Sequence, residues 1–284
     1  MAESEFVIRQ MTRSELDIAV DWAAAEGWNP GRFDADCFFA ADPLGFFIGL
    51  VDNQPVATIS VVKYDELSGF VGFYMVKPEF RGRGYGLRLW DFALNGSKEL
   101  CLGLDGVVAQ QGNYRKSGFN PAWRNIRCQG QGGGPLPDNL RVVPLATVPL
   151  AEICAYDRSF FPADRRRFLE SWLAQPQSTA LGIRDWDGRL PGYGVLRACR
   201  VGYKFGPLFA DRPGLAEELF LALKAHAPET ASVFLDVPEI NAAARALVER
   251  HRLATVFATA RMYRGACPKL SWERMYGITT FELG

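Results

Sequence analysis

The sequence predicts an α+β fold made of two similar halves, each with a mixed, mostly antiparallel twisted sheet flanked by helices. The chain has 284 residues, about twice the size of a typical domain of about 150 residues. Strand-like segments at residues 46–51, 56–62 and 70–76 follow one another in meander order, with helical patterns before and after them. Beyond a stretch rich in glycine and proline this pattern partly returns, which indicates an internal duplication.

The first half is expected to begin with a strand and a capped helix. Thr12 and Glu15 have the spacing of a capping box, which satisfies free amides at a helix start. In chain order the expected elements are a strand at 6–9, a helix from the capping box to about 26, a short helix at about 32–39, the three meander strands, a helix at 84–97 and a strand at 104–109.

Residues 129–139 form the clearest boundary, because four glycines and two prolines within this short stretch cannot sustain an element. The expected domains are therefore residues 1–130 and 140–284, joined by a linker at 131–139. The second half is expected to contain helices at 147–160, 164–174 and 213–225, strands at 179–184, 192–198, 203–209 and 232–237, and an edge strand at 277–283.

A loop rich in glycine and arginine joins the third meander strand to the helix that follows. Gly82, Gly84 and Gly86 let the backbone turn closely, and Arg81 and Arg83 add positive charge at the helix start. Free amides at a helix N-terminus suit a pyrophosphate. Neither G-x-x-x-x-G-K-[ST] nor the dinucleotide fingerprint is matched, so a different kind of phosphate loop is indicated.

The loop reads Arg81-Gly82-Arg83-Gly84-Tyr85-Gly86 and matches R-x-x-G-x-G, so it resembles the coenzyme A pyrophosphate loop of the GNAT superfamily of acetyltransferases. A second element, Tyr114-Arg115-Lys116-Ser117-Gly118-Phe119, resembles the Y-x-K-x-G-F segment of that family. In the second half Asp211 and Pro213 stand where phosphate would bind, and they supply negative charge and remove an amide. The chain thus resembles the tandem GNAT subgroup, with a degenerate C-terminal copy.

This resemblance implies an N-acetyltransferase that passes the acetyl group of acetyl-CoA directly to a primary amine in a ternary complex. It implies that Tyr114 is the general acid beside the sulfur and that backbone amides around Met75 and Val76 bind the thioester carbonyl. The predicted cofactor-binding residues are therefore Met75, Val76, Arg81, Gly82, Arg83, Gly84, Tyr85 and Gly86. The general base stays open between Tyr74, Asp65, Glu66 and a water relay.

The acceptor site is expected to be aromatic, since the family walls this site with its early helices and their connection. The candidate substrate residues are Trp28, Asn29, Phe33 and Tyr74. Such a pocket favours a small amine or amino acid over a protein tail, and the second domain is expected to add another wall. The run Arg165-Arg166-Arg167 could attract an anionic substrate, although a solvated helix face is the preferred interpretation.

Composition excludes several other classes of partner. Lysine plus arginine equal aspartate plus glutamate at 32 each, so no basic field for nucleic acid is present. The start of the chain does not resemble a signal peptide, no apolar run approaches about 18 residues, and a cytoplasmic location without membrane contact is expected. Scattered cysteines without C-x-x-C and only two histidines argue against a metal site.

Several questions stay open at this stage. A homodimer is compatible with the sequence. Two other functions compete with the acetyltransferase: a non-catalytic module that senses acyl-CoA, and an acyltransferase that uses a different acyl donor.

Overall fold

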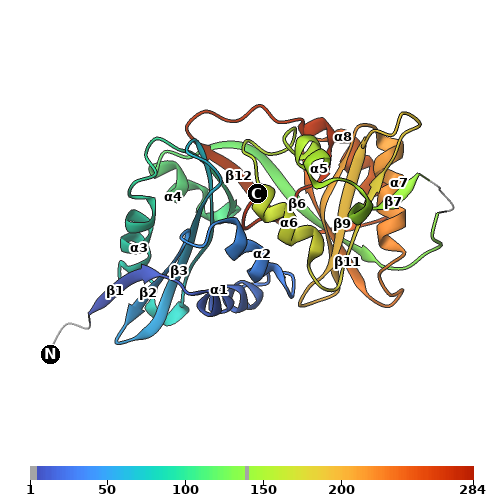
Figure 1. The fold of residues 1–284 in the computed structure, drawn as a ribbon. Coiled ribbons are helices and arrows are strands. Elements are labelled where there is room, and N and C mark those ends of the chain that lie inside the picture. Colours follow the sequence, from blue (N-terminus) through green and yellow to red (C-terminus); the bar gives the residue numbers. More distant parts are fainter. Residues whose placement is uncertain (1–4, 138–140) are drawn as a thin grey trace.

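The computed structural model describes residues 5–137 and 141–284, and it confirms an α+β fold with a largely antiparallel twisted sheet flanked by helices (Figure 1). The first half contains β1 (Phe6–Gln10), α1 (Arg13–Ala25), α2 (Asp34–Ala41), β2 (Phe46–Val51), β3 (Gln54–Lys63), β4 (Ser68–Val76), α3 (Tyr85–Leu94), β5 (Cys101–Val107), α4 (Gln111–Lys116) and β6 (Asn120–Gln131). The second half contains β7 (Val142–Pro144), α5 (Leu150–Asp157), α6 (Arg166–Ala174), β8 (Ser178–Ile183), β9 (Gly192–Ala198), β10 (Tyr203–Ala210), α7 (Pro213–Lys224), β11 (Ser232–Pro238), α8 (Ala242–Arg250), β12 (Ala254–Arg264) and β13 (Met275–Gly277).

The start of α1 and the short helix α4 form as the sequence predicts. The hydroxyl of Thr12 accepts a hydrogen bond from the Glu15 amide, and the Glu15 carboxylate accepts one from the Thr12 amide, so the capping box at the start of α1 is confirmed. The apolar face of α1 packs into the core through Leu16, Ala19 and Val20, which are buried. α4 is a short helix of 6 residues.

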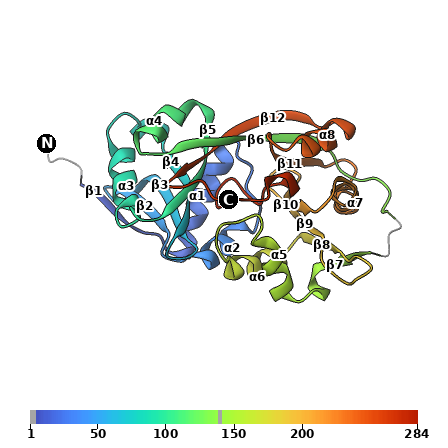
Figure 2. The same cartoon turned by 90° about the horizontal axis from the view of Figure 1, so that it is seen from above.

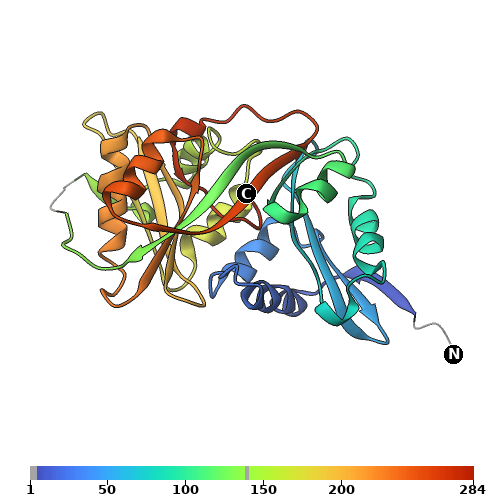
Figure 3. The ribbon, with the colours of Figure 1, turned by 180° about the vertical axis from the view of Figure 1, so that it is seen from behind.

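The two halves exchange strands at the centre of the sheet. The described strands are ordered β1-β2-β3-β4-β5-β12-β6-β11-β10-β9-β8-β7, and β13 pairs with β10. β12 therefore separates β5 from β6, although β5 and β6 are the neighbours in sequence. Figure 3 shows β6 in green and β12 in red running side by side from one half to the other. The sheet of each half is thus completed by a strand of the other.

The glycine-rich boundary at residues 129–139 begins within β6, one of the two exchanged strands. β6 continues to Gln131, which pairs with Ser232 of β11, so residues 129–131 belong to a strand. Residues 138 and 139 of the expected linker lie outside the described residues. β12 pairs with β6 as far as Gln129, and β11 alone continues the pairing to Gln131.

The expectation of an edge strand at residues 277–283 is wrong. β13 ends at Gly277, and the closing segment (residues 278–284) is buried between the two halves, where the end marked C lies in Figures 1 and 2. The Ile278 amide donates a hydrogen bond to the Asp236 carbonyl at 2.9 Å, and the Tyr64 hydroxyl donates to the Leu283 carbonyl at 2.9 Å. Contacts with both halves therefore hold this segment in place of sheet pairing.

The interpretation of the arginine run as a solvated face also needs correction at its first residue. Arg166 and Arg167 are exposed, but Arg165 is buried. Arg165 donates two hydrogen bonds to Asp157, both of 2.7 Å, and one to the Thr279 hydroxyl at 2.9 Å. It therefore anchors the closing segment rather than facing water.

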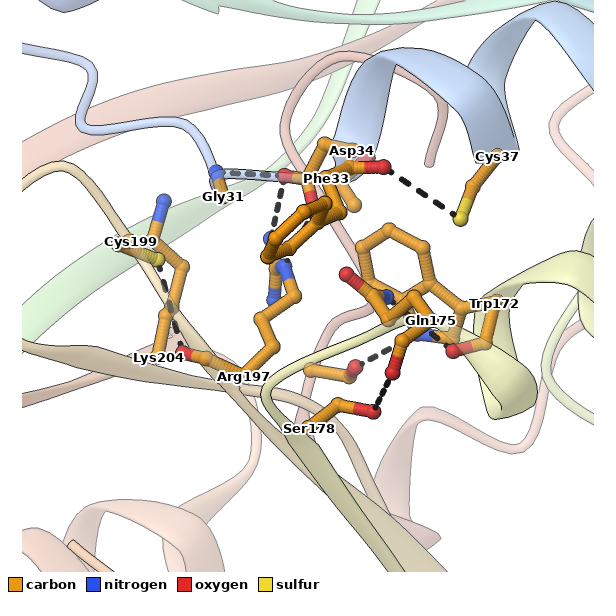
Figure 4. Close-up of polar contacts among 12 residues, drawn as sticks. Gly31, Phe33, Asp34, Cys37, Trp172, Gln175, Ser178, Arg197, Cys199 and Lys204 are labelled. Atoms are coloured by element: carbon orange, nitrogen blue, oxygen red, sulfur yellow. Dashed lines mark hydrogen bonds and ion pairs between the residues drawn. The ribbon is translucent and has the colours of Figure 1, made fainter.

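Buried ion pairs join the two halves. Asp34 of α2 accepts hydrogen bonds from Arg197 of β9 at 2.9 and 3.2 Å and from the Gly31 amide at 2.7 Å (Figure 4). Arg127 of β6 makes two hydrogen bonds of 2.6 and 2.7 Å to Asp236 of β11. Although burial opposes it, Arg127 holds the pKa of Asp236 below its ordinary value.

We predict that Arg127→Met lowers the free energy of unfolding by about 3–5 kcal/mol, because it leaves the buried Asp236 carboxylate without a partner. Arg124→Met is the matched control on the same strand. Its partner Glu239 lies 3.4 Å away and both side chains are well exposed, so the loss should stay below about 1 kcal/mol. Urea unfolding of the three proteins measures both values, and equal losses would contradict the prediction.

Candidate active site

β4 carries a bulge that opens the sheet. Its register with β3 shifts between Gly72 and Met75, where β4 has one residue more than β3. Phe73 lies in the bulge with a φ of 48°, and its carbonyl accepts a hydrogen bond of 2.8 Å from the Thr58 hydroxyl. The parallel pairing of β4 with β5 ends at Val71. Beyond that residue the two strands separate.

A cavity of about 350 Å³ lies where β4 and β5 separate. Its walls come from β4, β5, α3 and α4 of the first half, and from β12 and the closing segment of the second. The cavity is therefore built by both halves, as a consequence of the strand exchange.

Tyr114 and Tyr74 line this cavity together with Trp90. Their ring centroids lie 5.8 and 5.0 Å from that of Trp90. Gly106 of β5 makes room for Tyr114, because a Cβ atom at Gly106 would lie 2.2 Å from the Tyr114 ring. Burial raises the pKa of Tyr114 to about 12 and also raises the pKa of Tyr74. Both hydroxyls are thus protonated at neutral pH.

The glycine-rich loop leaves the start of α3 without a side-chain cap. Gly84 is the residue before the helix, with a φ of 81°, and no side chain accepts hydrogen bonds from the first amides. Gly82 has a φ of 76°. Gly86 is required for packing, since its Cβ would lie 2.9 Å from the Tyr74 hydroxyl. The ring of Tyr85 packs on that of Phe6, with 4.7 Å between the ring centroids.

The two arginines of the loop have partners in the structure. Arg81 forms an ion pair with Glu26 at 2.6 Å and donates to the Val76 carbonyl at 2.8 Å. Arg83 lies over the ring of Phe80, 5.3 Å from its centroid. Arg81 and Glu26 both line the cavity, so this pair forms part of its rim.

The structure brings together some of the candidate acceptor residues and leaves two outside. Trp28 and Tyr74 line the cavity, and Asn29 and Phe33 do not. The Asn29 side chain exchanges two hydrogen bonds of 2.9 Å with the Val201 backbone, which joins the two halves. Phe33 directly precedes α2, beside Asp34 (Figure 4). The aromatic residues Trp28 and Tyr74 thus belong to the cavity, whereas Asn29 belongs to the contact between the halves.

The open candidates for the general base also separate. Tyr74 lines the cavity, whereas Asp65 and Glu66 do not. The Asp65 carboxylate accepts hydrogen bonds from the Leu67 and Ser68 amides at 2.9 and 2.7 Å, so it organises the turn between β3 and β4.

Five polar residues of the cavity were missed at the sequence level: Glu26, Asp105, Gln110, Thr259 and Glu282. Asp105 is the charged residue of an otherwise apolar strand, which was an available signal. It is paired with Arg261 at 2.8 and 2.6 Å and accepts a hydrogen bond of 2.7 Å from Asn125. Thr259 and Glu282 reach the cavity only through the strand exchange, so no local pattern marks them.

The start of α7 in the second half differs from that of α3. Asp211 stands just before Pro213, the first residue of α7. Its carboxylate accepts hydrogen bonds from the Tyr156 hydroxyl at 2.8 Å and from Arg274 Nε at 3.0 Å. α7 also begins without a side-chain cap, so the difference from α3 is that Pro213 removes one of the first amides and that the Asp211 carboxylate, with partners of its own, lies beside the helix start.

Within residues 5–137 and 141–284, no helix has the length and apolar character needed to cross a bilayer. In the same part of the chain, no three His, Cys, Asp or Glu side chains gather in a way that could hold a metal ion.

Family models match both halves of the chain. The Acetyltransferase (GNAT) family matches residues 10–119, and an Acetyltransferase (GNAT) domain matches residues 153–277. A protein of Pseudoalteromonas sp. (strain SANK 73390) named holothin acyltransferase is 31% identical over 272 residues, which cover 95% of this chain and 92% of that protein. The uncharacterized N-acetyltransferase YitH of Bacillus subtilis is 24% identical over 190 residues, which cover 64% of this chain and 65% of YitH.

Solved structures share the fold. A putative acetyltransferase from Pyrococcus horikoshii superposes with a TM-score of 0.82 at 22% identity, covering 100% of this chain and 98% of that one. A tandem GNAT protein from the clavulanic acid biosynthesis pathway superposes with a TM-score of 0.65 at 14% identity, covering 93% of this chain and 100% of that one. The fold with two halves is therefore shared with a solved tandem GNAT protein.

We predict opposite effects for two glycine-to-alanine changes near Tyr114. Gly106→Ala should lower the free energy of unfolding by about 1–3 kcal/mol, because the new methyl group overlaps the Tyr114 ring. Gly112→Ala is the control within α4, where nothing lies within 4 Å of the added Cβ, and it should raise stability by about 0.5–1 kcal/mol. Chemical unfolding tests both, and a neutral Gly106→Ala would show that Tyr114 does not pack against β5.

Proposed function

Because the chain belongs to the GNAT superfamily of acyltransferases and contains two GNAT domains in tandem, we propose that it transfers acetyl from acetyl-CoA to a primary amine of a small molecule or amino acid. The observation that carries this proposal is the cavity between β4 and β5, which has Tyr114 in its wall and the uncapped start of α3 beside it. Donor and acceptor would meet there and react directly.

The start of α3 supports binding of the donor's pyrophosphate. Its first amides lack a capping side chain, and the positive end of the helix dipole favours an anion. Arg83 adds charge nearby. The exposed pair between Arg81 and Glu26 is worth about 0–1 kcal/mol, so a phosphate can replace Glu26 at little cost.

The pairing of β4 favours Val76 over Met75 as the amide that binds the thioester carbonyl. The Lys77 amide donates to the Val56 carbonyl at 2.9 Å and so faces β3. Backbone groups alternate in direction along a strand. The Met75 amide therefore also faces β3, whereas the Val76 amide faces the space between β4 and β5. A donor aimed at developing charge is typically worth 10²–10³ in kcat.

Tyr114 is the proposed general acid. It lines the cavity, and burial raises its pKa to about 12, so it carries a proton at neutral pH. It can give that proton to the departing thiolate, and it regains one from solvent afterwards.

The cavity suits a small acceptor. About 350 Å³ is near the lower end of the range for small-molecule sites, and Trp28, Phe257 and Phe281 give it aromatic walls. The name of the Pseudoalteromonas relative makes holothin an acceptor to test. That name does not specify the acyl group, so succinyl-CoA and longer acyl-CoA molecules belong in the same panel as acetyl-CoA.

We predict that acetyl-CoA binds at the start of α3 and not at the start of α7. At 100 times its dissociation constant it should stabilise the protein by about 2.7 kcal/mol. Gly84→Asp should abolish this stabilisation, because a carboxylate would cap the free amides and repel phosphate. Gly214→Asp, in the first turn of α7, is the matched control and should leave binding intact. Calorimetry and thermal unfolding measure both, and loss of binding only in Gly214→Asp would place the donor in the second half.

We predict that Tyr114→Phe lowers kcat by about 10²–10⁴-fold, because the departing thiolate loses its proton donor. The dissociation constant of the Tyr114→Phe variant for acetyl-CoA should equal that of the wild type. Release of free thiol with a panel of amines gives the rate, and Tyr203→Phe in the second half is the control. An unchanged rate would exclude Tyr114 as the acid, whereas wild-type protein that binds acyl-CoA without any turnover would be the non-catalytic sensor.

A further inference from the structure

We propose that Glu282, from the closing segment of the second half, is the general base that takes a proton from the acceptor amine. The proposal rests on the acyl transfer proposed above and adds the missing proton acceptor to it. It makes the second half a direct contributor to the chemistry.

The first support is that Glu282 lines the cavity without a hydrogen-bond partner among residues 5–137 and 141–284. Its residue is 2% exposed, and no group in that part of the chain donates a hydrogen bond to its Oε1 atom. Among the described residues it also forms no ion pair. A buried polar atom without a partner is costly and rare in proteins. The N–H of a bound amine would supply the absent donor.

A second unpartnered group lines the same cavity. The hydroxyl of Thr259 on β12 is buried and has no hydrogen-bond partner among the described residues. Glu282 and Thr259 both come from the second half, whereas the proposed donor-binding groups all belong to the first. The strand exchange therefore adds two unpartnered polar groups to a cavity that Tyr74 lines from the first half.

The backbone around Glu282 is held against the bulged strand. A Cβ atom at Gly72 would lie 2.1 Å from the Glu282 carbonyl oxygen, so only glycine allows this approach. The Leu283 amide donates to the Thr280 hydroxyl at 2.9 Å, and the Leu283 carbonyl accepts from Tyr64 at 2.9 Å. These contacts hold the backbone of Glu282 beside Gly72, at the start of the bulge, and the cavity that Glu282 lines extends from there along β4 to Val76.

The charges around Glu282 leave it suited to the exchange of a proton. Burial raises its pKa, and Asp34 acts in the same direction, while Lys204, Arg127 and Arg197 lower it. Arg127 and Arg197 are each committed to a buried aspartate, and Lys204 donates to the Trp28 carbonyl at 3.3 Å. The net direction is upward, toward neutral pH, where a general base is most effective.

The other candidates fit this role less well. Asp105 lines the cavity, but its oxygens are occupied by Arg261 and Asn125. Tyr74 has a raised pKa, so its phenolate is scarce at neutral pH. Asp65 and Glu66 lie outside the cavity.

The step balances with groups already named. The amine nitrogen forms a bond to the thioester carbonyl carbon, and one of its protons passes to the Glu282 carboxylate. The carbon–sulfur bond then breaks, and the thiolate takes the proton of Tyr114. The products are an amide and a free thiol, and solvent afterwards removes the proton from Glu282 and returns one to Tyr114.

The test compares Glu282→Gln, Glu282→Asp and the wild-type enzyme with acetyl-CoA and an aromatic amine, whose own protonation lies well below the pH range used. Wild-type kcat/KM should rise as the pH increases through the pKa of Glu282. Glu282→Gln should lower kcat by about 10²–10⁴-fold and abolish this rise, without changing the dissociation constant for acetyl-CoA. Glu282→Asp should recover part of the rate and show a displaced rise. The exposed Glu273→Gln is the control.

The outcomes separate this proposal from the function on which it rests. If the wild-type enzyme turns over and Glu282→Gln keeps its rate within about threefold, or keeps the same pH dependence, Glu282 is not the base. If wild-type protein transfers no acyl group to any amine, the proposed function fails and this inference fails with it. If Glu282→Gln does not fold, the pH profile of Glu282→Asp decides, since an unshifted rise would also overturn the proposal.

Discussion

The insertion of β12 between β5 and β6 is the constraint on which the rest of the structure depends. Without it β5 would expose a row of unpaired backbone groups, and β6 would lose one of its two neighbours. The same insertion carries Thr259 to the cavity wall, and the chain beyond it brings Glu282 between the halves. Cavity and sheet are thus products of one pairing.

The buried ion pairs follow from this arrangement. Arg261 of β12 meets Asp105 of β5, 156 positions earlier in the chain, and Arg127 of β6 meets Asp236 of β11. Each pair lies across two strands that neighbour each other in space but not in sequence. Such pairs add little net stability, yet removing one partner is costly because it strands a charge. A shifted strand register between the two halves would leave these buried charges unpaired and is therefore disfavoured.

Local physical signals allowed much of the first half to be predicted. The capping box of α1, the meander of β2 to β4, and the loop before α3 are encoded within short windows, and short windows are what periodicity and turn chemistry describe. The bulge at Phe73 left no such signal. The place of Glu282 in the cavity wall was also not predictable, because it depends on strand pairing between distant segments. Arg165 looked like part of a solvated run for the same reason, since its partner Asp157 and its neighbour Thr279 lie on other elements.

The strand exchange also has a consequence for biosynthesis. A ribosome adds about 5–20 residues per second, so the 156 positions between Asp105 and Arg261 correspond to roughly 8–30 s during which β5 has emerged without its neighbour. An open strand edge is a template for pairing with other chains. Newly made protein must therefore pass through an interval in which this edge of β5 lacks its final neighbour. Cellular yield is then governed by how well this edge is shielded as much as by the stability of the finished molecule.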